Sequence, residues 1–292
     1  MKPQPLIPLL KKYCRLFLGF SLILISIQIT NGCSNKTSAK QAKASIEKTL
    51  PNVLEKVRKF GVLRVGTTGD FKPFSYQTPQ DSINFHGIDI ELAKDLGKAL
   101  GAHVVFVKTS WPNLMEDLKS GAYDIGMSGI TITPERTTLA AFSIPALTSG
   151  KAAITRDENV SRFTSLEEIN KKGVKVIVNP GGTNEAFARA HFPNATLVEN
   201  DENITIFQKI VDGEADLMVT DATETLVQER IHPELDAVNP ETPFNSFQMG
   251  FIFKKDVAFK TFVDQWLTGV KTNGNYAIIF EKELGKIKQT VS

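Results

Sequence analysis

Leu118-Lys-Ser-Gly-Ala-Tyr-Asp-Ile-Gly-Met-Ser128 has the same layout as a later stretch, Ile210-Val-Asp-Gly-Glu-Ala-Asp-Leu-Met-Val-Thr220. Each reads as the end of a helix, a glycine, an aspartate, a buried strand and a polar turn. A second pair of segments shows the same likeness. The apolar run Val62–Gly66 is followed by the loop Thr-Thr-Gly-Asp, and the run Val174–Val178 is followed by the loop Asn-Pro-Gly-Gly-Thr. The two copies predict two similar lobes, although chance likeness between two ordinary strand–helix units would give the same pattern.

Short β-rich runs alternate with amphipathic stretches in the first copy. The pattern predicts helices over 46–60, 88–100 and 113–119. It predicts strands over 62–66, 104–107 and 123–127. Such alternation is typical of parallel strands covered by helices. We therefore expect an α/β fold with two lobes, each a mostly parallel sheet flanked by helices. Loops at the carboxyl ends of the strands would face a cleft between the lobes, where small molecules bind.

The amino-terminal segment is typical of an export signal. Four basic residues, the last of them Arg15, precede an apolar run over Leu16–Ile29 that is too short to span a membrane comfortably. The segment holds four of the 34 basic residues, which leaves 30 against 32 acidic residues in the rest of the chain. This near-neutral remainder argues against a nucleic-acid partner, which needs a concentrated basic face.

The cysteines also bear on the cell compartment. Cys14 lies inside the predicted leader, and Cys33 follows Thr-Asn-Gly, where a small residue before cysteine resembles the lipobox of bacterial lipoproteins. Thr30 and Asn31 depart from the usual pattern, so cleavage by the ordinary signal peptidase is the alternative. We expect a periplasmic protein, with lipid anchoring at Cys33 left open. No internal disulfide can form in the mature chain, and the four scattered histidines show no ligand spacing, so no metal site is expected.

Three motifs resemble the polar amino-acid-binding class of periplasmic solute-binding proteins. They are Gly66-Thr-Thr-Gly-Asp-Phe-Lys-Pro-Phe-Ser75, Gly87-Ile-Asp-Ile-Glu-Leu-Ala93 and Gly129-Ile-Thr-Ile-Thr-Pro-Glu-Arg136. The resemblance implies a two-lobed type II periplasmic binding protein fold in which the first lobe is discontinuous. The expected divisions are a leader over 1–33, a tether and helix start over 34–53, lobe one over 54–149 and 244–292, and lobe two over 150–243.

Two further motifs are similar to the enzyme branch of this superfamily, the cyclohexadienyl dehydratases. They are Asn179-Pro-Gly-Gly-Thr-Asn-Glu185 and Thr220-Asp-Ala-Thr-Glu224. That branch converts prephenate, and usually arogenate, to phenylpyruvate or phenylalanine. The resemblance therefore implies a secreted carbon–oxygen lyase that needs no metal or cofactor. The alternative is the non-catalytic amino-acid-binding component of an ABC importer, which hands its ligand to a membrane permease.

Arg136 is unusual because Thr133 and Pro134 predict a helix start, and a cation in the first turn faces the positive end of the helix dipole. The functional interpretation is a guanidinium fork that holds a ligand carboxylate. The alternatives are a solvated arginine or one paired with Glu135. The resemblance favours the ligand, with Ser128, Gly129 and Thr131 as further donors.

The remaining binding residues come from loops. The glycine-rich turn before the segment 185–191 would bring backbone and free N–H groups close to an anion, although a plain turn would look the same. Lys151 is a candidate second cation for a dianion, or an exposed lysine. Trp111 and Phe74 are candidate ring walls, or core residues. The predicted substrate-binding residues are Asp70, Phe74, Trp111, Ser128, Gly129, Thr131, Arg136, Lys151, Asn179, Gly182, Thr183, Asn184 and Asp221.

Glu224 separates the enzyme from the carrier. Asp221-Ala-Thr-Glu224 is also a good capping box, which needs no chemistry. The dehydratase resemblance implies instead that Glu224 is a protonated general acid. To stay half protonated at pH 7 its pKa must rise by about 3 units. Burial and nearby Asp221 would raise this pKa, whereas Arg136 and Lys151 would lower it. In carrier relatives an aspartate at the position of Asp221 holds the ligand's amino group.

Overall fold

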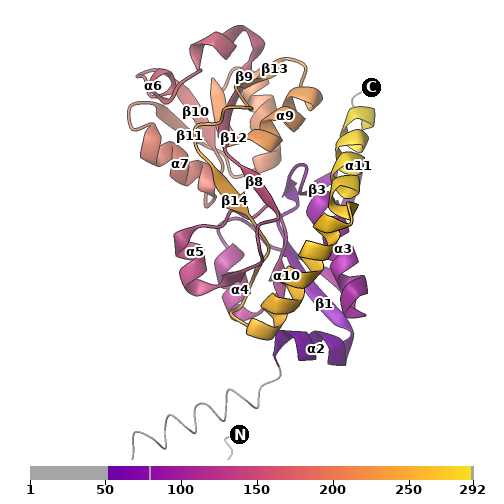
Figure 1. Cartoon of the computed structure of the whole chain (residues 1–292). Helices are drawn as coiled ribbons and strands as arrows, with labels where there is room; N and C mark the ends of the chain where they lie inside the picture. Colours follow the sequence, from indigo (N-terminus) through magenta and orange to yellow (C-terminus); the bar gives the residue numbers. More distant parts are fainter. Residues whose placement is uncertain (1–51, 79, 291–292) are drawn as a thin grey trace, which may run out of the picture. The chain divides into compact units, whose positions relative to one another are not determined.

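The computed structural model describes residues 52–78 and 80–290 (Figure 1). The predicted leader, the cysteine at its end and the tether lie outside the described residues. No helix in the described part of the chain is long and apolar enough to cross a membrane.

A five-stranded sheet organises the first lobe. Its strand order is β5-β1-β6-β15-β7, and the strands are β1 (Val62–Thr67), β5 (His103–Lys108), β6 (Ile125–Gly126), β7 (Ala141–Phe142) and β15 (Ile252–Phe253). The pairs β1–β5 and β1–β6 are parallel, whereas β15 is antiparallel to both of its neighbours. A separate three-stranded sheet consists of β2 (Asp70–Phe71), β3 (Ser75–Thr78) and β4 (Asp81–His86).

The second lobe repeats this arrangement. Its strand order is β11-β10-β12-β9-β13, and the strands are β9 (Lys151–Arg156), β10 (Lys175–Val178), β11 (Thr196–Glu199), β12 (Leu217–Asp221) and β13 (Leu235–Val238). Strand β10 is parallel to β11 and β12, and β9 is antiparallel to β12 and β13.

The predicted two-lobed α/β fold is confirmed, and each five-stranded sheet is mixed because a single strand runs against the direction of the others. The reason lies in how the chain passes between the lobes. Two short strands, β8 (Leu147–Ser149) and β14 (Phe247–Met249), pair antiparallel and carry the chain from one lobe to the other and back (Figure 1). The first sheet strand after each passage, β9 and β15, therefore enters its sheet against the direction of the others.

Helices flank both sheets. Those of the first lobe are α2 (Val53–Phe60), α3 (Ile88–Leu100), α4 (Leu114–Ser120), α5 (Pro134–Leu139), α10 (Val257–Thr272) and α11 (Asn275–Thr290). Those of the second are α6 (Leu166–Ile169), α7 (Thr183–His191), α8 (Ile206–Val211) and α9 (Ala222–Ile231), with 3-10 turns η1 (Asp157–Arg162) and η2 (Asn203–Thr205). The bounds of α3 are those expected from the sequence, while the earlier part of the helix predicted over 46–60 lies outside the described residues.

Each lobe has its own apolar core. In the first lobe α3 and α10 pack on the sheet through buried side chains such as Leu92, Leu96 and Phe259. In the second lobe Val176, Val219 and Phe192 belong to a separate cluster. Since burial of apolar surface is the main source of stability, two separate cores allow each lobe to remain folded while the contact between them changes.

Candidate functional site

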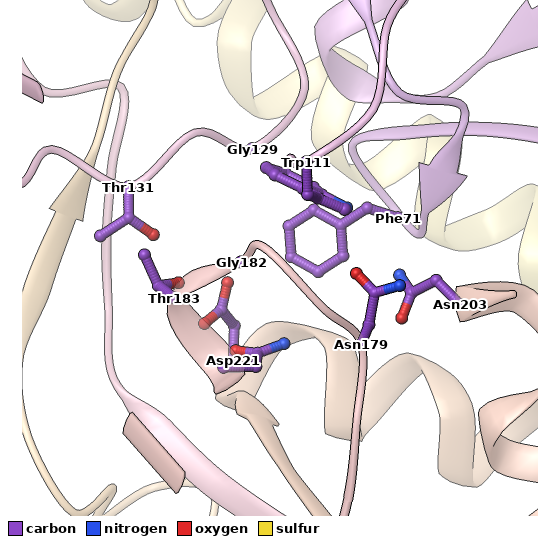
Figure 2. A pocket seen from close by; sticks show the side chains of 10 residues that line it. Phe71, Trp111, Gly129, Thr131, Asn179, Gly182, Thr183, Asn203 and Asp221 are labelled. Carbon is purple, nitrogen blue, oxygen red and sulfur yellow. The ribbon is translucent and has the colours of Figure 1, made fainter. Parts of the chain in front are cut away.

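Eight of the predicted binding residues line one pocket between the lobes (Figure 2). The empty space in this pocket, open solvent included, is about 370 Å³. The first lobe contributes Phe71, Trp111, Gly129 and Thr131, and the second lobe contributes Asn179, Gly182, Thr183, Asn184, Asn203 and Asp221. Strand ends and helix starts of both lobes therefore meet here.

Two aromatic rings form the apolar wall. Phe71 and Trp111 lie edge to face, with ring centroids 5.8 Å apart (Figure 2). The prediction that Phe74 belongs to this wall is wrong: its side chain is only 2% exposed and packs behind Phe71, with ring centroids 5.2 Å apart. Phe71 lies in the same sequence motif, but the motif alone does not indicate which of the two rings faces the pocket.

The loop after β6 supplies fewer free donors than expected. Ser128 is fully buried, accepts a hydrogen bond from the Thr68 N–H at 3.1 Å and shares another with the Thr68 hydroxyl at 2.8 Å. The Gly129 N–H donates to Asp89 Oδ2 at 2.6 Å. The Ser128 hydroxyl and the Gly129 N–H therefore already have partners inside lobe one, and donation from Ser128 and Gly129 to a ligand stays a prediction.

Gly129 still has a steric role in this loop. Its φ is +65°, and a Cβ there would lie 2.6 Å from the ring of Phe71. The next lining residue, Thr131, also orients the predicted arginine, since its carbonyl accepts a hydrogen bond from Arg136 Nη1 at 2.8 Å. The loop therefore packs against the aromatic wall on one side and holds the guanidinium on the other.

Arg136 lies in the first turn of α5, where Thr133 accepts from its backbone N–H as the sequence predicts. Its side chain is half-buried, and burial lowers the pKa of Arg136. Among the described residues no carboxylate lies within ion-pair distance of the guanidinium, so the alternative of a pair with Glu135 is not realised. It does not line the pocket itself but adjoins it through Thr131.

Lys151 is buried, which rules out the alternative of an exposed lysine. Its ammonium group donates to Asp221 Oδ1 at 2.5 Å, to Thr183 Oγ1 at 3.2 Å and to Asn184 Oδ1. It also lies 4.9 Å from the centre of the Phe247 ring. All three of its donors are therefore used within lobe two. Its positive charge balances the Asp221 carboxylate that lines the pocket.

The glycine-rich turn brings the two lobes into contact. Gly181 has a φ of +83°, and a Cβ there would lie 2.7 Å from the ring of Pro112 in lobe one. Gly182 caps α7 without a side-chain hydrogen bond, so the start of that helix faces the pocket through Gly182, Thr183 and Asn184. The turn thus allows a close approach that a side chain at Gly181 would prevent.

Glu224 does not form the capping box. Asp221 is the N-cap residue of α9, but its side chain makes no capping hydrogen bond, because its Oδ1 is held by Lys151. The Glu224 carboxyl is 1% exposed, and its Oε2 accepts a hydrogen bond from the Thr220 hydroxyl at 2.6 Å. Thr220 also accepts from Asn184 Nδ2 at 2.9 Å. Two hydrogen bonds thus join Glu224 to a residue that lines the pocket.

Burial raises the pKa of Glu224 to about 8. The Thr220 hydrogen bond opposes this rise, the carboxylates of Asp221 and Asp70 add to it, and Lys151 opposes it. Burial dominates because removing a carboxylate from water disfavours its charged form. The carboxyl group is therefore largely protonated at neutral pH, as the general-acid interpretation requires.

Asp70 is beside the pocket rather than in its lining. Its carboxyl Oδ1 is buried and has no hydrogen-bond partner among the described residues, and burial raises the pKa of Asp70. Its backbone carbonyl accepts from Asn203 Nδ2 at 3.0 Å, which joins the two lobes. Asn203 and Phe71 both line the pocket although sequence reasoning did not select them, and nothing in the sequence around Asn203 marks it as a site residue.

The fold and the pocket define a two-lobed α/β binding protein whose ligand site lies between the lobes. The chain belongs to the bacterial extracellular solute-binding proteins, family 3, which match its residues 63–286. Among curated relatives, the cyclohexadienyl dehydratase of Pseudomonas aeruginosa is 50% identical over 221 residues, or 76% of this chain and 82% of the relative. The L-cystine-binding protein of Escherichia coli is 29% identical over 60% of this chain and 64% of its own.

Solved structures give the same picture. An ancestral amino-acid-binding protein, described as a precursor of cyclohexadienyl dehydratase, is 37% identical with a TM-score of 0.74, covering 79% of this chain and 99% of its own. An ancestral cyclohexadienyl dehydratase is 45% identical with a TM-score of 0.51, covering 81% of this chain and 98% of its own. Both carriers and dehydratases thus share this fold, so the side chains of the site decide between the two functions.

Proposed function

We propose that this protein is an exported dehydratase that converts prephenate to phenylpyruvate, with Glu224 as the general acid. The observation that carries the proposal is the buried Glu224 carboxyl, whose pKa rises to about 8 and which Thr220 joins by two hydrogen bonds to Asn184 in the pocket lining. A plain carrier has no need of a protonated carboxyl there. The 50% identity to a cyclohexadienyl dehydratase supports the same function.

The charges of the site suit a dianion better than a free amino acid. Asp221 would attract an ammonium group, but Lys151 balances its charge at 2.5 Å. Arg136 has no carboxylate partner among the described residues, so it is available to bind a substrate carboxylate in a bidentate manner. The wall of Phe71 and Trp111 offers an apolar surface to a six-membered ring. The ring would then lie between the aromatic wall and the polar face of lobe two.

The reaction needs one proton and a fixed orientation. As the bond from the ring to its carboxylate breaks, carbon dioxide leaves and the electron pair enters the ring. The bond from the ring to the hydroxyl oxygen breaks at the same time, and Glu224 gives that oxygen its proton, so water leaves. Glu224 then regains a proton from solvent. Aromatisation supplies the driving force, so the protein mainly has to orient the substrate and exclude water.

A direct assay tests this function. Purified protein is mixed with prephenate, and phenylpyruvate is followed by its ultraviolet absorbance. Turnover that is lost in Glu224→Gln supports the proposal. If prephenate is not consumed while a free amino acid binds tightly by calorimetry, the protein is the importer component instead. The carrier is favoured by one specific observation, the aspartate retained at position 221, which would also accept the amino group of arogenate.

Localisation forms the last part of the proposal. We propose a periplasmic protein, in keeping with the extracellular family to which the chain belongs. Lipid attachment at Cys33 is tested by fractionating cells that express the full chain and its Cys33→Ala variant. Membrane recovery of the full chain but not of the variant supports an anchor, whereas equal recovery in the soluble fraction rules it out.

A further inference from the structure

A chain of hydrogen bonds connects a buried cation to the general acid. Lys151 Nζ donates to Asn184 Oδ1, Asn184 Nδ2 donates to Thr220 Oγ1 at 2.9 Å, and Thr220 Oγ1 donates to Glu224 Oε2 at 2.6 Å. Thr220 is fully buried at the end of β12 and does not line the pocket. Thr220 therefore interacts with Asn184 and Glu224 and is not part of the lining that would contact a substrate.

The direction of each hydrogen bond follows from the chemistry of the groups. An ammonium group only donates, so the oxygen of the Asn184 amide must face Lys151. The amide nitrogen, which also only donates, must then face Thr220. The Thr220 oxygen is therefore an acceptor from Asn184. Its single hydroxyl hydrogen has one acceptor within reach among the described residues, which is Oε2 of Glu224.

The opposite arrangement would be costly. If the Glu224 proton were on Oε2 and pointed at Thr220, the threonine hydrogen would have no acceptor in a fully buried place. An unsatisfied buried donor is destabilising. With the proton on Oε1, Oε2 is a carbonyl oxygen, which accepts the threonine hydrogen better than a protonated oxygen does. The proton of neutral Glu224 is thereby favoured on Oε1, the oxygen that Thr220 does not contact.

We propose that Thr220 is a positioning residue that fixes the proton of Glu224 on Oε1, the oxygen that must deliver it to the departing hydroxyl. This proposal rests on the proposed dehydratase function. The hydrogen-bond chain orients Glu224 and does not transfer its proton, because Thr220 already accepts from Asn184 and directs its own hydrogen at Glu224. The proton lost in each turnover must therefore return through Oε1.

Four charged groups act on Glu224 and must be kept constant in any test. Asp221 at the start of α9, Asp70 on β2 and Lys151 on β9 act on its carboxyl, and Lys72 next to β2 also interacts with it. Thr220→Val keeps the shape of the side chain and alters none of these charges. Thr220→Ser keeps the hydroxyl and is the matched control.

The experiment measures turnover of prephenate across a pH series for the full-length protein and its variants. For Thr220→Val we expect kcat to fall about tenfold, since the proton is no longer held on the productive oxygen, with KM changed less than about twofold. The alkaline limb of kcat should move to higher pH, because the lost hydrogen bond favoured the charged carboxylate. Thr220→Ser should match the wild type in both respects.

A second variant and a second readout keep the proposal testable if Thr220→Val does not fold. Thr220→Ala also removes the hydroxyl group and adds no charge, so kcat should fall as well. Infrared spectroscopy gives a measurement independent of turnover. The carbonyl band of protonated Glu224, assigned by its loss in Glu224→Gln, should shift in Thr220→Val and stay unchanged in Thr220→Ser.

The outcomes separate this inference from the proposed function. If Glu224→Gln abolishes turnover while Thr220→Val keeps wild-type kcat, pH profile and infrared band, Thr220 has no positioning role and only the function stands. If the wild type does not consume prephenate, or if Glu224→Gln remains fully active, the proposed function fails. An unshifted band in Thr220→Val would overturn the role of Thr220 even then.

Discussion

At the scale of single residues, Glu224 carries the strongest expectation. Replacing it with glutamine removes the transferable proton but keeps the size of a side chain that is 1% exposed. We expect Glu224→Gln to lower kcat for prephenate about a hundredfold or more, with KM little changed. Glu116→Gln, at an exposed surface glutamate of lobe one, is the control and should retain full activity. Equal loss in both variants would point to a general defect instead of a lost acid.

The pKa of Glu224 also predicts how stability depends on pH. Its pKa is about 8 in the folded protein, above the value of 4.5 for a free glutamate. Between these values the unfolded chain ionises while the folded protein keeps the proton, so the folded state loses stability as pH rises. The loss from this one group is about 1.4 kcal/mol per pH unit. Glu224→Gln lacks this ionisable group. Urea titrations should therefore show its free energy of unfolding increasing relative to that of the wild type as the pH rises from 5 to 8. A constant difference over that range would contradict the raised pKa.

The same residue explains what sequence could and could not provide. The Thr-Asp-Ala-Thr-Glu motif located Glu224, but it could not exclude the capping box, since a helix start with an acid three residues later satisfies both interpretations. Only the pairing of Asp221 with Lys151 shows that the box is not formed. In the same way Phe71 and Phe74 belong to one motif and nothing in that motif distinguishes them. The packing of the loop decides which of the two rings faces the pocket.

At the scale of elements, the joint between α3 and the loop after β6 predicts a stability effect. Asp89 near the start of α3 accepts from the Gly129 N–H at 2.6 Å, and burial raises the pKa of Asp89 to about 7. Asp89→Ala leaves a buried N–H unpaired, so we expect a loss of about 1–3 kcal/mol in the free energy of unfolding. Asp89→Asn keeps an oxygen acceptor without a charge and should be close to wild type. Chemical denaturation at pH 8 measures both, and equal stability of the two variants would show that the hydrogen bond is unimportant.

Most elements were predictable because their signals are local. The helix over Ile88–Leu100 ends at Gly101, and its apolar positions recur with helical spacing, so both its type and its bounds follow from the sequence. Strand direction is not a local property. The antiparallel entry of β9 and β15 depends on where the chain passes between the lobes, which periodicity does not record. The expected lobe boundaries stay a prediction that the arrangement of the sheets supports.

At the scale of the whole molecule, the contact between the lobes predicts how binding responds to a single methyl group. Gly181 has a φ of +83°, and a Cβ there would lie 2.7 Å from Pro112 of the other lobe. Gly173 has a φ of +92° in the same lobe, but a Cβ there would meet nothing within 4 Å. Alanine at either position strains the backbone by about 1 kcal/mol, so the pair differs mainly in the interlobe clash.

We therefore expect Gly181→Ala to weaken binding of prephenate to the inactive Glu224→Gln protein at least about tenfold, which corresponds to about 1.4 kcal/mol. Gly173→Ala in the same background should bind as tightly as its parent. Calorimetry gives the two affinities, and urea titrations verify that both variants lose similar stability. Because the clash acts only when the lobes meet, equal affinity in the two variants would mean that the ligand binds without the close approach at Gly181, and the pocket would then have to form in a more open arrangement of the lobes.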